Sequence, residues 1–290
     1  MQNKPISTYK TLRAGNRLWS LDTPLVAGVI NVTPDSFFDG SRAKNLEGAL
    51  KTAEKMIAEG ADILDVGGYS TRPGAGEVNE EEELKRVIPV VEAIFKQFPN
   101  SVISVDTFRS SIASEAIESG ATIINDVTAG TYDGKMISVV AQKKATYILM
   151  HMRGTPATMG ELTEYNNVVT EVASYLNERA SEALRTGVTE IILDPGFGFA
   201  KTAEQNFSML RNFQHFTRTG FPVLAGLSRK SMIWRTLKTD PAHALNGTTA
   251  LNMAALIGGA SILRVHDVKE AKETVLLFKE LKGKSSIHNP

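Results

Sequence analysis

The feature of this sequence that most constrains its fold is a series of eight short, predominantly apolar runs. They are residues 25–30, 63–66, 102–105, 122–124, 146–150, 190–193, 222–225 and 261–265. None of them alternates apolar with polar residues, as a strand with one face in water does. The runs therefore predict strands buried on both faces, which is typical of a parallel sheet covered by helices.

Between these runs, apolar residues recur at the spacing of amphipathic helices. Residues 46–57 repeat apolar side chains at intervals of three and four, and Gly60 provides a stop. Asn79 and Glu82 resemble a capping box at the start of a second helix. Further helices are expected over residues 110–119, 168–184, 209–216, 247–257 and 269–282.

Strand–helix alternation, repeated eight times, predicts an α/β fold of the (β/α)8 TIM-barrel type in a single domain over residues 25–290. An open, doubly wound sheet is the alternative. Residues 1–24 are an N-terminal extension before the first barrel strand. Within it, we expect residues 5–24 to form a hairpin over the floor of the barrel.

The composition excludes several classes of protein. Of the 290 residues, 42% are hydrophobic and 22% are charged, as in ordinary soluble globular proteins. The 32 basic residues balance the 32 acidic ones, so we expect neither a nucleic-acid partner nor an anionic membrane surface. The absence of cysteine excludes disulfides and thiolate chemistry. Polar and glycine residues interrupt the most apolar stretch, residues 248–265, and residues 1–20 lack a signal-peptide core, so we expect a cytoplasmic protein.

Polar and ionisable side chains follow the ends of nearly all the predicted strands. In a barrel of this type the chemistry lies at the C-terminal ends of the strands, so these residues are candidates for one site. In chain order they are Asn31, Asp65, Asp106, Asn125, Asp126, His151, Asp194, Ser228, Arg229, Lys230, Arg264 and His266.

Two chemistries can be distinguished among these candidates. Asp106, Asn125 and Asp194 can accept from, or donate to, a flat nitrogen heterocycle, for which a carboxylate beside two ring N–H donors is a strong partner. The cationic set consists of Arg72, Lys230, Arg264 and His266. Together with Asn31 it could hold a pyrophosphate and Mg²⁺, which takes oxygen ligands and keeps several waters. The sequence has no zinc or EF-hand spacing, no Walker loop and no dinucleotide-binding fingerprint.

Each candidate also has an ordinary structural interpretation. Asp106 could cap the helix that follows it, and Asp126 with the residue before it could form a turn. Lys230 could be a solvated surface cation. We interpret Asp65 as a buried structural carboxylate paired with the backbone or a strand neighbour, and His151 as a supporting residue rather than a ligand. The shared position of these residues at one end of the barrel favours the functional interpretation.

Seven segments resemble, in order, the signature motifs of dihydropteroate synthases. They are residues 28–37, 60–74, 104–107, 124–126, 193–199, 228–231 and 264–267. The matches extend over residues 28–267, which is almost the whole predicted barrel. Such enzymes join a pterin pyrophosphate to p-aminobenzoate with the help of Mg²⁺ in folate synthesis. The resemblance implies the same reaction here, and a homodimer.

The resemblance also implies roles for individual residues. The pterin ring would be held by Asp106, Asn125, Met150, Asp194, Phe199 and Lys230. The pyrophosphate would be held by Asn31, Arg72, Arg264 and His266, with Asn31 also a ligand of Mg²⁺. The p-aminobenzoate pocket would be formed by Phe37, Thr71, Arg72, Pro73, Lys230 and Ser231. The residues implied to be catalytic are Asp106, Asp194, Lys230, Arg264 and His266.

Three other functions fit the sequence less well. A methyltetrahydrofolate-dependent methyltransferase serving a corrinoid would share the pterin acids but would not need residues 70–73 or 228–230. A Schiff-base aldolase needs a lysine that projects from a strand into the barrel, whereas Lys230 follows the seventh predicted strand. A non-catalytic pterin-binding paralogue is disfavoured by the intact Asn31 and Lys230.

Overall fold

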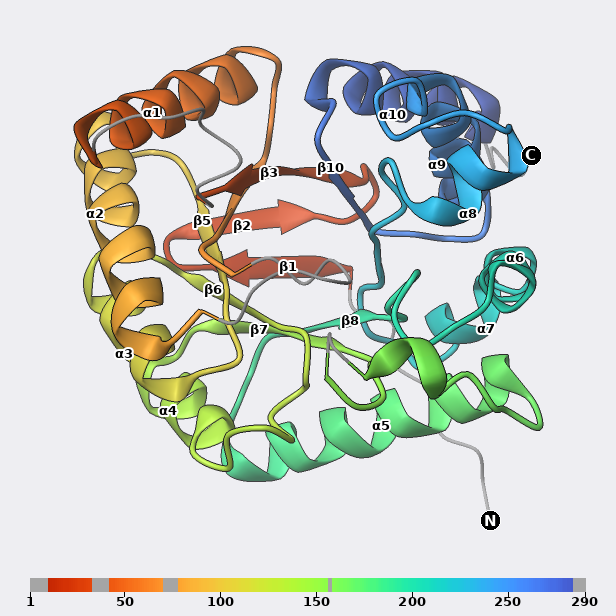
Figure 1. Cartoon of the computed structure of the whole chain (residues 1–290), viewed down its shortest axis with the longest axis horizontal. Coiled ribbons are helices and arrows are strands. Elements are labelled where there is room, and N and C mark those ends of the chain that lie inside the picture. Colours follow the sequence, from red (N-terminus) through yellow and green to blue (C-terminus); the bar gives the residue numbers. More distant parts are fainter. Residues whose placement is uncertain (1–9, 33–41, 70–77, 156–157, 284–290) are drawn as a thin grey trace, which may run out of the picture.

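The structure of the chain is a computed structural model, which describes residues 10–32, 42–69, 78–155 and 158–283. Helices surround a ring of strands (Figure 1). The strands of the ring are β3 Leu25–Asn31, β4 Ile63–Gly67, β5 Ile103–Asp106, β6 Ile123–Asp126, β7 Thr146–Met150, β8 Ile191–Asp194, β9 Leu224–Ala225 and β10 Ile262–Val265. The helices are α1 Arg42–Ala58, α2 Glu80–Gln97, α3 Ser110–Glu118, α4 Met136–Lys143, η2 Met159–Glu161, α5 Val168–Thr186, α6 Ala203–Arg211, α7 Gln214–Thr217, α8 Ser231–Thr236, α9 Leu245–Ile257 and α10 Val268–Lys282.

The eight ring strands are all parallel and run in the order β8-β7-β6-β5-β4-β3-β10-β9. A single parallel bridge between Leu193, on β8, and Val223, just before β9, closes the ring. The predicted (β/α)8 barrel is therefore confirmed, and the open doubly wound sheet is wrong. Leu193 is fully buried, so the closing contact is part of the core.

The N-terminal hairpin consists of β1 Thr11–Ala14 and β2 Arg17–Ser20, which pair antiparallel. Its Leu12 and Ala14 are buried in one apolar cluster with inward-facing residues of the ring strands, and Trp19 packs against the same cluster. The hairpin crosses the middle of the barrel in Figure 1. The predicted hairpin under the barrel is confirmed. Its apolar side chains cover the inward-facing apolar residues at the floor of the ring, which would otherwise be exposed to water.

A regular change of polarity inside the barrel positions the candidate site. Successive inward-facing residues of a strand are two positions apart, so a floor residue is followed by the residue of the next layer. Four strands place an isoleucine in the floor and a polar residue above it, as Ile63–Asp65, Ile123–Asn125, Ile192–Asp194 and Ile262–Arg264. The floor is dry and apolar, whereas the layer above it is polar and lies toward the C-terminal ends of the strands.

Some element boundaries differ from the sequence prediction. The helix expected over residues 209–216 is divided into α6 and α7, and α6 begins earlier than predicted, at Ala203. The early start follows from a capping box, in which Thr202 Oγ1 accepts from the Gln205 N–H at 3.2 Å and Gln205 Oε1 accepts from the Thr202 N–H at 2.8 Å. Helices α4 and α8 were not predicted. Among the described residues, no helix is both long and apolar enough to span a membrane.

Candidate active site

The centre of the polar layer is Arg264, whose guanidinium joins two carboxylates from different strands. Its Nε donates to Asp65 Oδ2 at 2.6 Å, and its Nη2 donates to Asp106 Oδ2 at 2.7 Å. Asn125 Nδ2 lies 3.4 Å from the same oxygen of Asp65, at the limit of a hydrogen bond. The sequence prediction of Asp65 as a buried carboxylate holds, but its main partner is an arginine on a strand two places away, beyond β3.

The proximity of two carboxylates changes the proton affinity of Asp106. Burial raises its pKa to about 7; Arg264 opposes this rise, and the negative charge of Asp65 adds to it. Burial alone would lower the pKa of Arg264, but Asp65 and Asp106 outweigh burial and raise it. The arginine is therefore permanently charged, whereas Asp106 changes its charge near neutral pH.

Asp194 and Lys230 form a second pair of opposite charges at the barrel mouth. Asp194 Oδ1 accepts from the Gly196 N–H at 2.7 Å, which fixes the carboxylate at the start of a glycine-rich loop. Burial raises the pKa of Asp194, and Lys230 opposes that rise. Lys230 Nζ donates to the Phe197 carbonyl and lies 4.5 Å from the centre of the Phe199 ring. Burial lowers the pKa of Lys230 to about 8, against the opposing effect of Asp194.

His266 is held by a serine from the neighbouring loop. Ser228 Oγ accepts from the His266 backbone N–H at 3.2 Å and lies 3.0 Å from His266 Nδ1. A hydroxyl that accepts from one N–H still has its own proton to donate. Toward Nδ1, Ser228 Oγ can either donate that proton or accept from an Nδ1–H, so it holds both the backbone and the ring of His266 in either tautomer.

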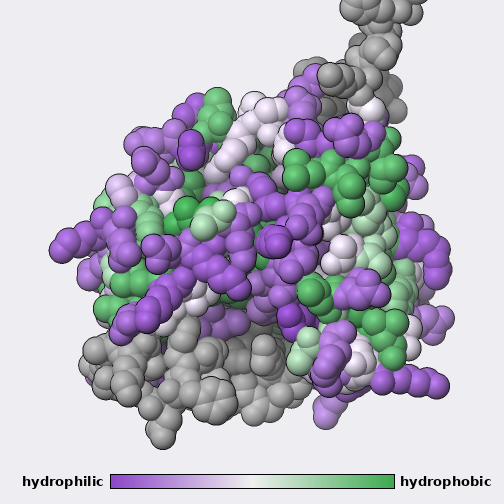
Figure 2. All heavy atoms as spheres, turned by 90° about the horizontal axis from the view of Figure 1, so that it is seen from above, coloured by the Kyte–Doolittle hydropathy of each residue, from purple (hydrophilic) through white to green (hydrophobic). Residues whose placement is uncertain are grey.

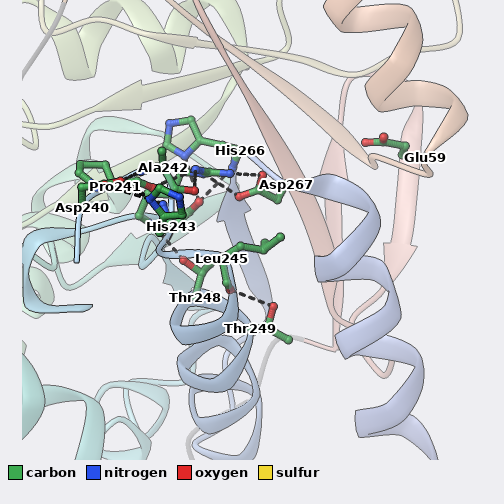
Figure 3. Close-up of polar contacts among 12 residues, drawn as sticks. Glu59, Asp240, Pro241, Ala242, His243, Leu245, Thr248, Thr249, His266 and Asp267 are labelled. Carbon is green, nitrogen blue, oxygen red and sulfur yellow. Dashed lines mark hydrogen bonds and ion pairs between the residues drawn. The ribbon is translucent and has the colours of Figure 1, made fainter. Parts of the chain in front are cut away.

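The next residues in the two loops, Arg229 and Asp267, form a second contact between them. Its Nε and Nη2 donate to the two carboxylate oxygens of Asp267 at 2.9 and 2.7 Å, and its Nη1 donates to the carbonyls of Pro241 and Ala242. Figure 3 shows Asp267 at the end of β10, beside the loop that contains Pro241 and Ala242. Thr248 Oγ1 accepts from the Arg229 N–H at 3.1 Å. These contacts hold Arg229 in a left-handed backbone conformation, with φ of 55°.

The adjacent residues Asn125 and Asp126 have different functions because they face opposite sides of β6. Asp126 points away from the lumen, where it accepts from the N–H groups of Thr128 and Gly130 and from the Tyr147 hydroxyl at 2.7 Å. It is the turn-forming residue that the sequence suggested. Asn125 faces Asp65 inside the barrel, so only Asn125 contributes to the polar layer.

The remaining predicted site residues fall into two groups. Met150 is buried at the end of β7 in an apolar cluster that also includes Phe108 and Met152, and Phe199 packs against this cluster. Asn31, at the end of β3, is half-buried, and Ser231 begins α8. The other predicted residues, Phe37, Thr71, Arg72 and Pro73, lie outside the residues that the structure describes.

One buried charge beside the site was not predicted. Lys201 is 8% exposed and directly follows the loop that carries Asp194 and Phe199. A lysine is normally at the surface, so nothing in its sequence position indicated burial. Its position between the glycine-rich segment and the capping box of α6 was the only available signal.

Comparison with known proteins identifies the family. The profile described as "Pterin binding enzyme" matches residues 27–266. A dihydropteroate synthase of Synechocystis sp. is 45% identical over 84% of this chain and 85% of its own length. The solved structure of Xanthomonas albilineans dihydropteroate synthase with 4-aminobenzoic acid superposes with a TM-score of 0.89 at 38% identity, over 95% of this chain and 99% of that one.

A second solved structure leads to the same family. The Yersinia pestis dihydropteroate synthase in a sulfonamide drug complex has a TM-score of 0.89 and 37% identity, over 94% of this chain and 100% of that chain. The similarity thus extends over the barrel, the floor hairpin and the polar layer together. The chain belongs to the dihydropteroate synthase family of pterin-binding enzymes.

Proposed function

We propose that this chain is a transferase of folate biosynthesis that condenses 6-hydroxymethyl-7,8-dihydropterin pyrophosphate with p-aminobenzoate to give 7,8-dihydropteroate and pyrophosphate. The observation that carries the proposal is the polar layer. Acidic and amide groups (Asp106, Asn125, Asp194) and cationic groups (Lys230, Arg264) meet at one barrel mouth. A substrate with a nitrogen-rich ring at one end and an anion at the other needs both kinds of group.

The acidic and amide groups suit the pterin ring. Asp194 and Asp106 accept from ring N–H donors, Asn125 can both donate and accept, and Lys230 donates. The buried Asn125 Oδ1 has no hydrogen-bond partner among the described residues, and an unmet acceptor at a barrel mouth supports a role in ligand binding. Met150 and Phe199 supply apolar surface for the ring faces.

The cationic groups suit the pyrophosphate. Arg264 keeps its charge at every physiological pH, and the imidazole of His266, held by Ser228, is the second candidate donor. As the methylene C–O bond breaks, its electron pair passes to the pyrophosphate oxygen, and these donors stabilise that charge. The arylamine nitrogen then forms the new C–N bond and releases its proton to solvent. Asp194 stabilises the electron-poor pterin methylene cation, and orientation of the amine replaces a strong base.

The described residues offer few ligands for a magnesium ion. Within the described residues, no cluster of three or more histidine and acidic side chains could hold a metal ion. Asn31 is the half-buried C-terminal residue of β3, and its amide oxygen is a suitable single ligand. The residues present therefore fit Mg²⁺ held by Asn31, substrate phosphates and water. When bound, the ion neutralises part of the charge of the departing pyrophosphate.

The p-aminobenzoate would lie next to Lys230 and Ser231, with Phe37, Thr71, Arg72 and Pro73 completing its pocket. Relatives solved with 4-aminobenzoic acid and with a sulfonamide support p-aminobenzoate as the second substrate and this chain as a sulfonamide target. Lys230 directly precedes Ser231, the first residue of α8, so these two proposed contacts are adjacent in the chain.

One coupled assay distinguishes this function from its alternatives. Purified protein is given the pterin pyrophosphate, p-aminobenzoate and Mg²⁺, and dihydropteroate and pyrophosphate are both quantified. We expect equal amounts of the two products, with none when p-aminobenzoate is omitted. Pterin binding without pyrophosphate release would instead support a non-catalytic paralogue, and methyl transfer from methyltetrahydrofolate to a corrinoid would support the methyltransferase.

We further propose that the protein is cytoplasmic and forms a homodimer, and exposed apolar side chains on α9 and α10 support the homodimer. Leu276, Leu277 and Leu281 on α10 are 61%, 63% and 70% exposed, and Ile257 at the end of α9 is 68% exposed. Figure 2 shows apolar patches among polar residues on the right of the molecule, the side of α9 and α10 in Figure 1. Leu277→Lys should convert the dimer to a monomer in sedimentation analysis, whereas Leu184→Lys on α5 should not.

A further inference from the structure

Lys201 is a buried lysine that the proposed reaction does not use. It ends the loop between β8 and α6 and is 8% exposed. Burying a lysine costs free energy unless hydrogen bonds compensate for the lost water. The burial of Lys201 must therefore be explained by the hydrogen-bond partners of its amino group.

The amino group has three close partners. Lys201 Nζ donates to the carbonyls of Gly196 and Phe199, both at 2.8 Å, and lies 3.0 Å from Nδ1 and 3.4 Å from the carbonyl oxygen of His151. An ammonium can donate all three hydrogen bonds, and a neutral amine can donate two and accept one from a His151 N–H. The partner set is complete in either protonation state.

These partners come from a loop whose backbone is unusually curved. Gly196, Gly198 and Ala200 all have left-handed φ values, of 68°, 81° and 48°. A Cβ atom on Gly196 would lie 2.1 Å from the His151 carbonyl oxygen, so the loop approaches the end of β7 as closely as a backbone can. The curvature directs two carbonyls inward, onto Lys201.

The same loop carries the contacts assigned to the pterin. Asp194 begins it, the Phe197 carbonyl accepts from Lys230, and the Phe199 ring lies under the Lys230 ammonium. On the other side of Lys201, His151 directly follows Met150. Lys201 is therefore one contact away from the loop after β8 and from the end of β7.

We propose that Lys201, together with His151, is a positioning residue for the pterin pocket: its amino group joins the β8 loop to the end of β7 and so fixes Asp194 and Phe199 toward the substrate. The proposal rests on the pterin roles proposed above for those two residues. We assign no substrate contact to Lys201 itself.

The electrostatic environment agrees with a bracing role. Burial lowers the pKa of Lys201 well below its usual value; Lys230 and Arg153 lower it further, and Asp194 opposes them. Burial, with Lys201 and Arg153, lowers the pKa of His151 to about 2. His151 is thus neutral at any working pH and cannot repel Lys201 through a charge of its own.

The test replaces Lys201 by methionine, which keeps the length of the side chain and removes the amino group. We expect the KM for the pterin pyrophosphate to rise at least tenfold, while the KM for p-aminobenzoate at saturating pterin substrate changes less than twofold. Lys272→Met is the matched control, because Lys272 donates to Asp62 at 2.9 Å at the opposite end of the barrel. Urea unfolding of both variants measures any loss of stability.

A second pair of variants covers the case in which Lys201→Met does not fold. His151→Leu removes the partner of Lys201, and His151→Asn returns a polar atom near the position of Nδ1. We expect His151→Leu to raise the KM for the pterin substrate. His151→Asn should have a KM close to that of the parent protein. The proposal would be overturned if the KM values for both substrates rose by the same factor. It would also be overturned if Lys272→Met, with the same loss of stability, raised them equally.

Calorimetry of pterin binding separates this proposal from the proposed function. If Asp194→Asn loses pterin affinity and folded Lys201→Met does not, the bracing role is wrong and the assigned pterin site stands. If Asp194→Asn binds pterin as well as the parent protein, both proposals are wrong. Loss of affinity in both variants supports both.

Discussion

Arg264 and Asp65 are joined by a 2.6 Å hydrogen bond although 199 residues separate them in the chain. The bond joins β10 to β4, the two strands that flank β3. It orients the guanidinium so that Nη2 also reaches Asp106, at 2.7 Å. Asp65 is almost completely buried, so its charge is compensated mainly by Arg264. Burial and the charge of Asp65 raise the pKa of Asp106 to about 7, against the opposing effect of Arg264.

The first prediction concerns stability against pH. The pKa of Asp106 is about 7 in the folded chain, and its ordinary value is 3.8. Between these values the unfolded chain binds fewer protons than the folded one, so Asp106 lowers the free energy of unfolding as pH rises, by at most about 1.4 kcal/mol per pH unit. Asp106→Asn should remove this slope. Urea unfolding at pH 5, 6, 7 and 8 measures it, and parallel curves for the two proteins would contradict the assignment.

The second prediction concerns Asp194. Asp194→Asn replaces a charge-assisted hydrogen bond by a neutral one, which removes about 1.5–3 kcal/mol, or roughly 10- to 150-fold in pterin affinity. Calorimetry measures the change. Asp62→Asn is the control, since Asp62 accepts from the Val26 N–H and from Lys272 at the floor end. Equal pterin affinity in both variants would remove Asp194 from the site.

The third prediction concerns the pH profile of kcat/KM above neutral pH. The pKa of Lys230 is about 8, so the residue loses its charge as pH rises through that value. If only the charged form binds the substrates well, kcat/KM falls towards tenfold per pH unit above pH 8. Lys230→Arg keeps its charge and should have a lower but flat profile up to pH 9.5. An identical alkaline limb in both proteins would show that another group titrates.

The barrel and the layer that bears the site could be predicted because both follow from local patterns. Uninterrupted apolar runs identify doubly buried strands, and the end of each run identifies the residues at the mouth. The Asn125–Asp126 pair shows the limit of this reasoning. Adjacent strand residues face opposite sides, so the assignment of one to the site and the other to a turn required the register of β6.

Other relationships depend on geometry that a single sequence does not contain. The partner of Asp65 is determined by which strands flank β3, and that order follows only from closure of the ring. Burial of Lys201 depends on three left-handed residues of one loop, Gly196, Gly198 and Ala200, and a single sequence does not determine these conformations. The start of α6, in contrast, could have been found from the threonine and glutamine of its capping box.

The fourth prediction concerns magnesium. Asn31→Ala removes the only protein ligand assigned to the ion, so the Mg²⁺ concentration for half-maximal activity should rise several-fold. Pterin affinity measured without Mg²⁺ should not change, because the amide is assigned to the ion and the pyrophosphate. Asn246→Ala, an exposed residue of α9, is the control. A Mg²⁺ titration identical to that of the parent protein would reject the ligand role of Asn31.

The last prediction concerns the connection between the loops after β9 and β10. Ser228 with His266, and Arg229 with Asp267, form two adjacent links between them. The left-handed backbone of Arg229 costs about 1–2 kcal/mol, which its ion pair and carbonyl contacts offset. Breaking the ion pair should therefore release Lys230 on one loop and His266 on the other.

Arg229→Gln and Asp267→Asn should each raise the KM for the pterin pyrophosphate, and the double variant should be little worse than either single one. The expected coupling is about 0.5–3 kcal/mol, which is roughly 2- to 150-fold in kcat/KM. Arg179→Gln is the matched control, since Arg179 also joins a carboxylate and a backbone carbonyl, but between α5 and the loop after β6. Strictly additive effects would mean that Arg229 and Asp267 act independently, and the two loops would then not be positioned by this ion pair.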